Sequence, residues 1–287
     1  MNYSEYTGAD ASAAEYTLTV SDGVILKIID FTPVAPVEGK PVIIFIAGWI
    51  SLISGWKDFL SAATPHYRII YVETREKESS FVPDIKKTSF RMPRMRDDIR
   101  DVIQGIIPEE TDFVLAGSSL GASAIMEYCM SKYRMPVCTA LVGPNAGFRF
   151  PLFLGSIIPL VHPGMYFAFK YVIKWYLRKF RVNSEVEREQ IEKYELTLDH
   201  ADPYKLKKNA LGIKRWSLPD SGRITAPSII FGATTDSLHS TEHIKGLMSH
   251  FTDGKYVELA SNKETHSGNA SRIMMDYIES VINSPRK

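Results

Sequence analysis

The chain has 287 residues, which is enough for one large α/β domain or for a core domain that carries an insertion. Its composition, 45% apolar and 23% charged, is typical of a globular protein and excludes a disordered or fibrous chain. The formal net charge of +1 provides no overall field that would recruit nucleic acid, so nucleic-acid binding is not expected.

Residues 1–14 are polar and acidic, without a basic start or an apolar core, so they predict no signal peptide and a loosely ordered N-terminal tail. Cys129 and Cys138 stand in apolar contexts without metal-ligand spacing. We expect buried free thiols, which suit a cytoplasmic location. Residues 151–169 lack Lys, Arg, Asp and Glu, but their prolines and glycines argue against one membrane-spanning helix.

Strand-like and helix-like segments alternate along the chain. Residues 16–20 and 24–31 look like paired strands with a turn at Asp22-Gly23. Apolar runs, typical of strands buried on both faces, follow at residues 41–47, 68–72, 113–115, 137–142 and 228–231, and the last strand is predicted at residues 256–259. Helices are expected at residues 95–107, 119–133, 241–251 and 269–281. The alternation predicts an α/β fold with a mostly parallel sheet flanked by helices, and ligands at the carboxyl ends of the strands.

Residues 148–222 interrupt the alternation. They contain no strand-like run, are rich in aromatic, Leu and Ile side chains, and include an amphipathic helical pattern at residues 185–198. We interpret them as a helical cap, or lid, inserted into a core domain made of residues 15–147 and 223–287.

The most informative motif is Gly117-Ser118-Ser119-Leu120-Gly121, which places G-x-S-x-G between an apolar strand and a helical run of small residues. A serine on such a tight turn is held in a strained conformation at a helix N-terminus, where negative charge is stabilised. The motif therefore predicts that Ser119 is a nucleophile. The alternative is a glycine-bounded turn with a capping serine.

A serine nucleophile needs a general base, and His266 lies between the last predicted strand and the final helix. Asp236 follows the strand at 228–231 and is the candidate acid that orients the imidazole. The chain order Ser119, Asp236, His266 is the order described for hydrolases of the α/β type. The alternatives are a surface histidine and a turn-stabilising aspartate.

Two backbone N–H groups are expected to stabilise the oxyanion. One belongs to Leu120, and the other to Trp49, because Gly48 lets the loop after residues 41–47 approach closely. Each donor contributes about 3 kcal/mol to the transition state. The alternative for Gly48-Trp49 is an ordinary turn with a packed indole.

With these motifs the sequence resembles the α/β-hydrolase superfamily, in its capped esterase and lipase branch. The matching segments are AGW at 47–49, GSSLG at 117–121, Asp236 after its strand and THSG around His266. The resemblance implies a mobile helical cap over the sheet. Three features differ from the pattern. Ala47 replaces a frequent His, Asp236 lies four rather than three residues after Gly232, and the loop from Glu73 to Lys77 is charged and is expected to reshape the site entrance.

These observations predict a serine hydrolase that cleaves a carboxylic ester or thioester through an acyl-enzyme, without metal or organic cofactor. The substrate is expected to be a small-molecule ester or acyl compound, and the same triad would serve an acyltransferase, a cofactor-free peroxidase or a C–C bond hydrolase. A catalytically silent binding module is the alternative from another class. The oligomeric state does not follow from the sequence.

The cap is expected to set specificity, with Phe153, Ile157 and Tyr166 contacting a lipid-like acyl chain. In residues 170–179 cationic and aromatic side chains interleave, which favours transient contact with a membrane surface. The alternative is that this stretch only packs the cap on the core.

Overall fold

One mixed sheet forms the centre of the protein. The computed structural model describes residues 3–35, 37–148, 158–160, 162–176, 188–219, 223–234 and 246–284. Within these residues the sheet has eight strands in the order β1-β2-β4-β3-β5-β6-β7-β8. The strands are β1 (Ala11–Thr19), β2 (Ile25–Pro33), β3 (Val42–Ile46), β4 (Ile69–Glu73), β5 (Phe113–Ser118), β6 (Thr139–Val142), β7 (Ser228–Ala233) and β8 (Gly254–Leu259). β2 pairs antiparallel with β1 and β4, and every other pair is parallel.

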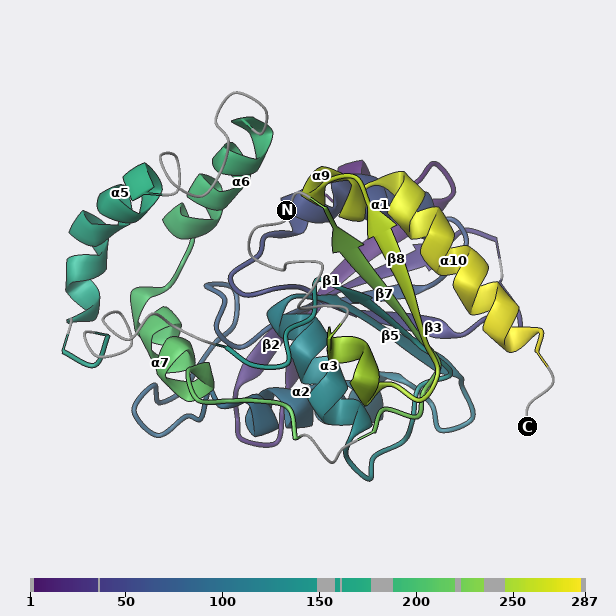
Figure 1. The fold of residues 1–287 in the computed structure, drawn as a ribbon, viewed down its shortest axis with the longest axis horizontal. Helices are drawn as coiled ribbons and strands as arrows, with labels where there is room; N and C mark the ends of the chain where they lie inside the picture. Colours follow the sequence, from purple (N-terminus) through teal and green to yellow (C-terminus); the bar gives the residue numbers. More distant parts are fainter. Residues whose placement is uncertain are drawn as a thin grey trace.

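Helices cover both faces of the sheet (Figure 1). α1 (Lys57–Ala63) and α10 (Gly268–Ile282) lie on one face, and α2 (Met92–Ile106) and α3 (Leu120–Cys129) on the other. Short helical turns complete the core: η1 (Ser4–Tyr6), η2 (Ile53–Trp56), η5 (Met248–His250) and α9 (Asn262–Thr265). This arrangement confirms the predicted α/β class with a mostly parallel, helix-flanked sheet.

The apolar strands explain why the sheet is buried on both sides. All five residues of β3 are buried. Ile44 and Ile46 join the cluster under α2 and α3, whereas Ile43 and Phe45 join the cluster under α1 and α10. Alternate side chains of one strand therefore fill two separate cores, as a continuous apolar run predicts.

The loose tail predicted for residues 1–14 differs from the structure. β1 begins at Ala11, and Tyr3 and Tyr6 are buried against the α1 face. The Tyr3 hydroxyl donates a hydrogen bond of 2.6 Å to Glu15. Two aromatic side chains thus anchor a segment whose polar composition had concealed its core contacts.

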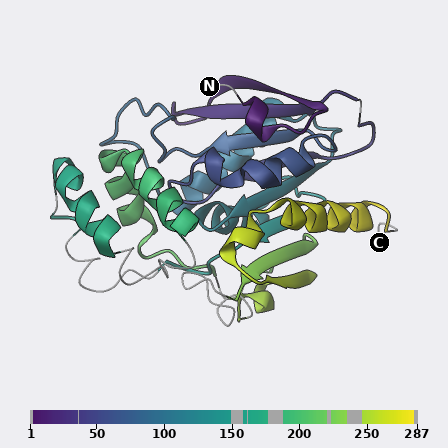
Figure 2. The ribbon, with the colours of Figure 1, turned by 90° about the horizontal axis from the view of Figure 1, so that it is seen from above.

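Three longer helices lie between β6 and β7 in the chain and sit together beside one end of the sheet (Figure 2). They are α5 (Tyr166–Tyr176), preceded by η3 (Pro163–Met165), then α6 (Arg188–Asp199) and α7 (Pro203–Ile213). α6 matches the amphipathic pattern expected at residues 185–198. None of the helices in the described ranges is long and apolar enough to cross a membrane.

The inserted segment leaves and rejoins the core through a narrow neck. Gly147 forms an antiparallel bridge with Ser217, and the N–H of Leu218 donates to the carbonyl of Ala146 at 2.6 Å. Beyond the neck, α7 is fixed to the core because Lys205 Nζ donates to the carbonyl oxygens of Lys77, at 2.8 Å, and Ser80.

Candidate active site

Ser119 lies on the tight turn that joins β5 to α3. Its backbone angles are φ 46° and ψ −112°, which is a strained conformation for a residue with a side chain. Its N–H donates to the carbonyl of Val142 on the neighbouring strand at 2.8 Å. Its side chain makes no capping hydrogen bond to α3. The turn is therefore the strained elbow that the motif predicts, and the capping-serine alternative has no support in the geometry.

Two glycines make this elbow possible. A Cβ on Gly117 would lie 2.6 Å from the carbonyl oxygen of Ile46, and one on Gly121 would lie 2.6 Å from that of Ala47. No side chain fits at either position, because the start of α3 packs directly on the backbone at the end of β3.

The loop after β3 lies against the elbow. A Cβ on Gly48 would come within 3.2 Å of Ser118 Oγ and 3.3 Å of Ser119 Cβ. The loop closes as a turn, with the N–H of Ser51 donating to the carbonyl of Gly48 at 3.0 Å. This close approach brings the turn that contains Trp49 against the elbow. The Trp49 ring is half-buried and packs on the α2–α3 side of the core, so the indole also has a packing role.

His266 follows α9 beyond the carboxyl end of β8, and its ring packs on Trp56 with 4.1 Å between centroids. Trp56 in turn packs on Phe45 of β3 at 4.6 Å. Since β5 and β8 run in the same direction, Ser119 and His266 both lie at the carboxyl edge of the sheet.

The hydrogen bonds of His266 indicate which ring nitrogen carries the proton. Nδ1 lies 2.9 Å from the carbonyl oxygen of Asn262 and 2.9 Å from Thr265 Oγ1. A carbonyl oxygen only accepts, and Thr265 Oγ1 donates to the same carbonyl at 2.8 Å. We therefore assign the proton to Nδ1, which leaves Nε2 with the lone pair that a general base needs.

Three of the predicted site residues, Asp236, Phe153 and Ile157, lie outside the described residues. The end of β7 that leads to Asp236 is described. The N–H of Thr234 donates to the carbonyl of Leu259 at 3.1 Å, and its hydroxyl donates to that of Ala260 at 2.8 Å. The strand before Asp236 thus ends beside the segment that leads to His266.

Tyr166 begins helix α5 and is 8% exposed. Its hydroxyl donates to the carbonyl of Leu198 on α6 at 2.7 Å, and burial raises its pKa to about 12. With Leu198 and Ala201 it forms a small cluster against which Ile50 packs. The inserted helices therefore contact the loop after β3 directly.

No protein-family model and no curated protein matches the sequence. Several solved structures are similar to the chain in fold. An enol-lactonase from Burkholderia xenovorans LB400 superposes with a TM-score of 0.74 at 17% identity, covering 92% of this chain and 100% of the other. A thermophilic esterase from Thermogutta terrifontis gives 0.73 at 15% identity over 95% and 100%. An H300N mutant of potato epoxide hydrolase gives 0.68 at 16% identity over 94% and 100%.

The chain has the α/β-hydrolase fold. In this α/β-hydrolase framework Ser119 follows β5, Asp236 follows β7 and His266 follows β8. The similar structures include an esterase, an enol-lactonase and an epoxide hydrolase, so the shared fold alone does not select one reaction.

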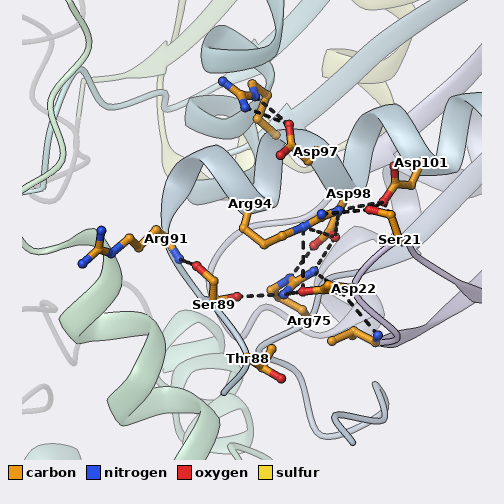
Figure 3. A network of polar contacts seen from close by, with 12 residues as sticks. Ser21, Asp22, Arg75, Thr88, Ser89, Arg91, Arg94, Asp97, Asp98 and Asp101 are labelled. Atoms are coloured by element: carbon orange, nitrogen blue, oxygen red, sulfur yellow. Dashed lines mark hydrogen bonds and ion pairs between the residues drawn. The ribbon is translucent and has the colours of Figure 1, made fainter. Parts of the chain in front are cut away.

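The charged loop after β4 was expected to reshape the site entrance, and its side chains from Glu73 to Lys77 are buried in the structure. Arg75 is fully buried and forms a fork of two hydrogen bonds with Asp98 of α2, from Nη2 at 2.5 Å and Nε at 2.6 Å (Figure 3). It also bonds Asp22, at 2.8 and 3.1 Å, and the carbonyl of Ser89 at 2.7 Å. Burial opposes the charge, but these acceptors raise the pKa of Arg75 above its usual range.

Glu76, in the same loop, was not among the candidates from the sequence. It is fully buried, and Thr74 Oγ1 donates to its Oε1 at 2.7 Å. Desolvation raises the pKa of the carboxyl group, while Lys77, Thr74 and the backbone N–H of Ile50 act to lower it. A charged residue in a loop is usually solvated, so no sequence signal pointed to a carboxyl group beside the loop after β3.

Among the described residues no group of three or more His, Cys, Asp or Glu side chains could hold a metal ion.

Proposed function

We propose that this protein is a serine hydrolase that cleaves a carboxylic ester or thioester. The observation that carries the proposal is the strained backbone of Ser119, held between β5 and α3 against the Gly48–Ser51 turn. Strain of this kind persists only where the surrounding structure holds it, and it presents the hydroxyl group at a helix N-terminus.

In the proposed reaction His266 Nε2 takes the proton of Ser119 Oγ while the oxygen attacks the carbonyl carbon. The negative charge that develops on the carbonyl oxygen is stabilised by the N–H groups of Leu120 and Trp49. The imidazolium then gives its proton to the leaving alcohol or thiol, and an acyl-enzyme remains. Water, activated by the same nitrogen, releases the acid and restores Ser119. Asp236 would stabilise the imidazolium from the Nδ1 side, together with the carbonyl of Asn262.

The substrate class that we favour is a lipid-like acyl ester. The inserted helices would act as a cap, because the cluster of Tyr166, Leu198 and Ala201 packs on Ile50, the residue next to the proposed donor Trp49. An acyl chain would then lie between the elbow and apolar cap residues such as Phe153 and Ile157. Profiling with p-nitrophenyl esters from acetyl to palmitoyl tests this choice, and activity on the acetyl ester alone would exclude it.

Covalent labelling with a fluorophosphonate probe tests the reaction itself. We expect labelling of the wild-type protein, its loss in Ser119→Ala, and its retention in Ser118→Ala, the matched control at the adjacent buried hydroxyl. His266→Ala is expected to lower kcat by about 10⁴-fold or more, and Asp236→Asn by less.

The outcomes separate the alternatives. A wild-type protein that is never labelled is a binding module on this fold rather than an enzyme. If an added alcohol or thiol takes the acyl group in preference to water, the protein is an acyltransferase. A cytoplasmic location remains a prediction from the cysteines, both of which are buried and free in the structure.

A further inference from the structure

Helix α5 exposes several apolar side chains, while its two lysines are mostly covered. Lys170 and Lys174 both pair with Asp199 at the end of α6, at 3.0 and 2.7 Å, and their side chains are only 16% and 14% exposed. Phe167, Tyr171 and Trp175 recur every fourth residue on the adjoining side and are 61%, 66% and 55% exposed. Lys170 Nζ lies 6.0 and 5.6 Å from the ring centroids of Phe167 and Tyr171, so the rings are more exposed than the lysine beside them, whereas a helix that packs on a protein core buries its apolar side.

Neighbouring residues extend the exposed surface. Val172 on the same side of α5 is 56% exposed, Met165 just before the helix is 49% exposed, and Leu160 is 83% exposed. We call these six residues the outward aromatic face: Leu160, Met165, Phe167, Tyr171, Val172 and Trp175. Full burial of one such side chain is worth about 1.5–3 kcal/mol, so leaving all six in water is unfavourable unless something covers them.

The charge of the surrounding sequence indicates what covers the face. Residues 148–184 contain no Asp or Glu but six cationic residues: Arg149, Lys170, Lys174, Arg178, Lys179 and Arg181. The whole chain has a net charge of only +1, so positive charge is concentrated in this stretch. Two of these cations, Lys170 and Lys174, already pair with Asp199 of α6, and the excess of cationic over acidic residues in the sequence of this stretch favours an anionic partner over a second copy of the chain.

We propose that the outward aromatic face rests on the surface of a lipid bilayer that carries anionic headgroups. Aromatic rings on one side of a helix and nearby cations are the features of helices that lie in the bilayer interface. The 11 residues of α5 span about 16 Å, too short to cross a bilayer, so the helix lies in the interface plane.

Co-sedimentation with vesicles tests this surface. We expect the protein to pellet with phosphatidylcholine vesicles that contain 30 mol% phosphatidylglycerol at least tenfold more than with phosphatidylcholine alone, and salt to weaken the binding. The triple variant Phe167→Ser/Tyr171→Ser/Trp175→Ser should lose at least tenfold in binding. Val34→Ser and Leu196→Ser, exposed apolar positions outside the face, are matched controls that should bind as the wild type.

Tryptophan fluorescence provides a second readout, because Trp175 is the exposed indole of the face. The emission should shift to the blue with anionic vesicles, and Trp175→Phe should abolish the shift while vesicle binding persists. Equal pelleting with and without anionic lipid, or undiminished binding by the triple variant, would overturn the proposal. So would a dimer in solution that the triple variant dissociates, since the face would then bind a second copy.

A second inference comes from the turn formed by Gly48, Trp49, Ile50 and Ser51. Ile50 has a φ of 48°, which a β-branched residue rarely adopts and which costs about 1–2 kcal/mol. Its side chain packs on Tyr166 and its neighbours, and its N–H lies beside the carboxyl group of Glu76. Oε2 of Glu76 is buried and has no hydrogen-bond partner among the described residues.

We infer that Glu76 is a positioning residue that holds the Gly48–Ser51 turn, and with it the N–H of Trp49, in the orientation that accepts an oxyanion. The inference depends on the proposed hydrolase function. It explains how the loop is supported although Ala47 stands where related sequences often have His. A buried carboxyl group with one oxygen unpaired costs stability, which points to a role for the hydrogen bonds that its other oxygen accepts.

Kinetics of three variants on a soluble p-nitrophenyl ester test Glu76. Glu76→Leu should lower kcat about 10- to 100-fold with KM changed less than twofold, because a donor that acts only in the transition state is displaced. Glu76→Gln keeps an acceptor and should recover most of kcat. Glu78→Leu, in the same loop but with a side chain 66% exposed, is the control and should behave as the wild type.

The outcomes are distinguishable from failure of the hydrolase proposal. If fluorophosphonate does not label Ser119 of the wild-type protein, both the hydrolase proposal and the positioning role of Glu76 are wrong. If the wild type is labelled but Glu76→Leu keeps kcat within twofold, or loses only thermal stability, the hydrolase proposal stands and the positioning role is wrong. Failure of Glu76→Gln to recover activity would also overturn it.

Discussion

Arg75 allows a quantitative test of how the loop after β4 is held. Replacing it with Met keeps the length of the side chain and removes the guanidinium group. Asp98 would then keep only Arg94 as a partner, at 3.0 Å, in a site where its side chain is 10% exposed. Asp22, the other partner of Arg75, is 27% exposed and can be hydrated again by small movements.

The expected magnitude follows from these partners. Removing one member of a buried ion pair typically costs 3–5 kcal/mol, because the remaining charge stays out of water, and we expect Arg75→Met to cost about 3 kcal/mol or more. The double variant Arg75→Met/Asp98→Leu removes both charges. Replacing a buried pair by apolar groups is often close to neutral. The loss of unfolding free energy in the double variant should therefore be smaller than the sum of the two single losses by about 1.5 kcal/mol or more.

Urea unfolding of the four proteins measures this cycle, with the slope m checked for constancy. Arg100→Met is the control, because the side chain of Arg100 is 28% exposed and pairs with Asp101, and we expect this substitution to cost less than about 1 kcal/mol. A loss below 1 kcal/mol for Arg75→Met, or single losses that simply add in the double variant, would refute the view that one coupled, desolvated pair holds the loop.

Three further predictions follow from other sites. Gly121→Ala should lower Tm by ~10 °C or abolish folding, because its Cβ would overlap the backbone of β3, whereas Gly55→Ala, with no atom within 4 Å, should change Tm by less than ~2 °C by thermal melting. Burial opposes ionisation of Asp101, but bonds from Ser21, Arg100 and Arg94 lower its pKa to about 2 from 3.8. Because the folded value is the lower one, the carboxylate adds about 2 kcal/mol above pH 4 that is lost as pH falls from 4 toward 2. In acid titrations Asp101→Asn should therefore be less stable than wild type at neutral pH and equal to it near pH 2, and a constant gap would contradict the pKa assignment. Burial raises the pKa of Cys129 and Cys138 to about 12, so iodoacetamide at pH 8 should leave both unmodified until urea unfolds the protein.

The sheet could be predicted because its strands obey one strong rule. Residues 41–47 and 229–231 are apolar throughout, which is typical of a strand buried on both faces. The N-terminal residues broke that rule, since Tyr3 and Tyr6 bury their rings while the residues between them stay polar. Helix α7 was likewise not separated from the insertion, because Lys205 and Asn209 are polar in sequence yet buried in the structure.

The elbow was recognisable because its requirements are local: a strand, two glycines and a helix within a few residues of Ser119. The support of the Gly48–Ser51 turn could not be recognised in the sequence, because it depends on contacts between distant segments. Glu76, Ile50 and Tyr166 meet only after folding, and a buried glutamate looks like any surface glutamate in a sequence. The contact of His266 with the carbonyl of Asn262 could not be predicted either, because every residue has a backbone carbonyl and the side-chain pattern does not indicate which one is used.

The neck formed by Ala146, Gly147, Ser217 and Leu218 is the point at which the inserted chain leaves and rejoins the core. β6 and β7 are neighbours in the sheet, so their pairing is formed within the core. The intervening chain is nevertheless tied to the core, because Lys205 of α7 donates to the carbonyl of Lys77 and the cluster of Tyr166, Leu198 and Ala201 packs on Ile50. A graft that replaces this chain at the same four residues must therefore supply new contacts for the loop after β4 and for the turn after β3.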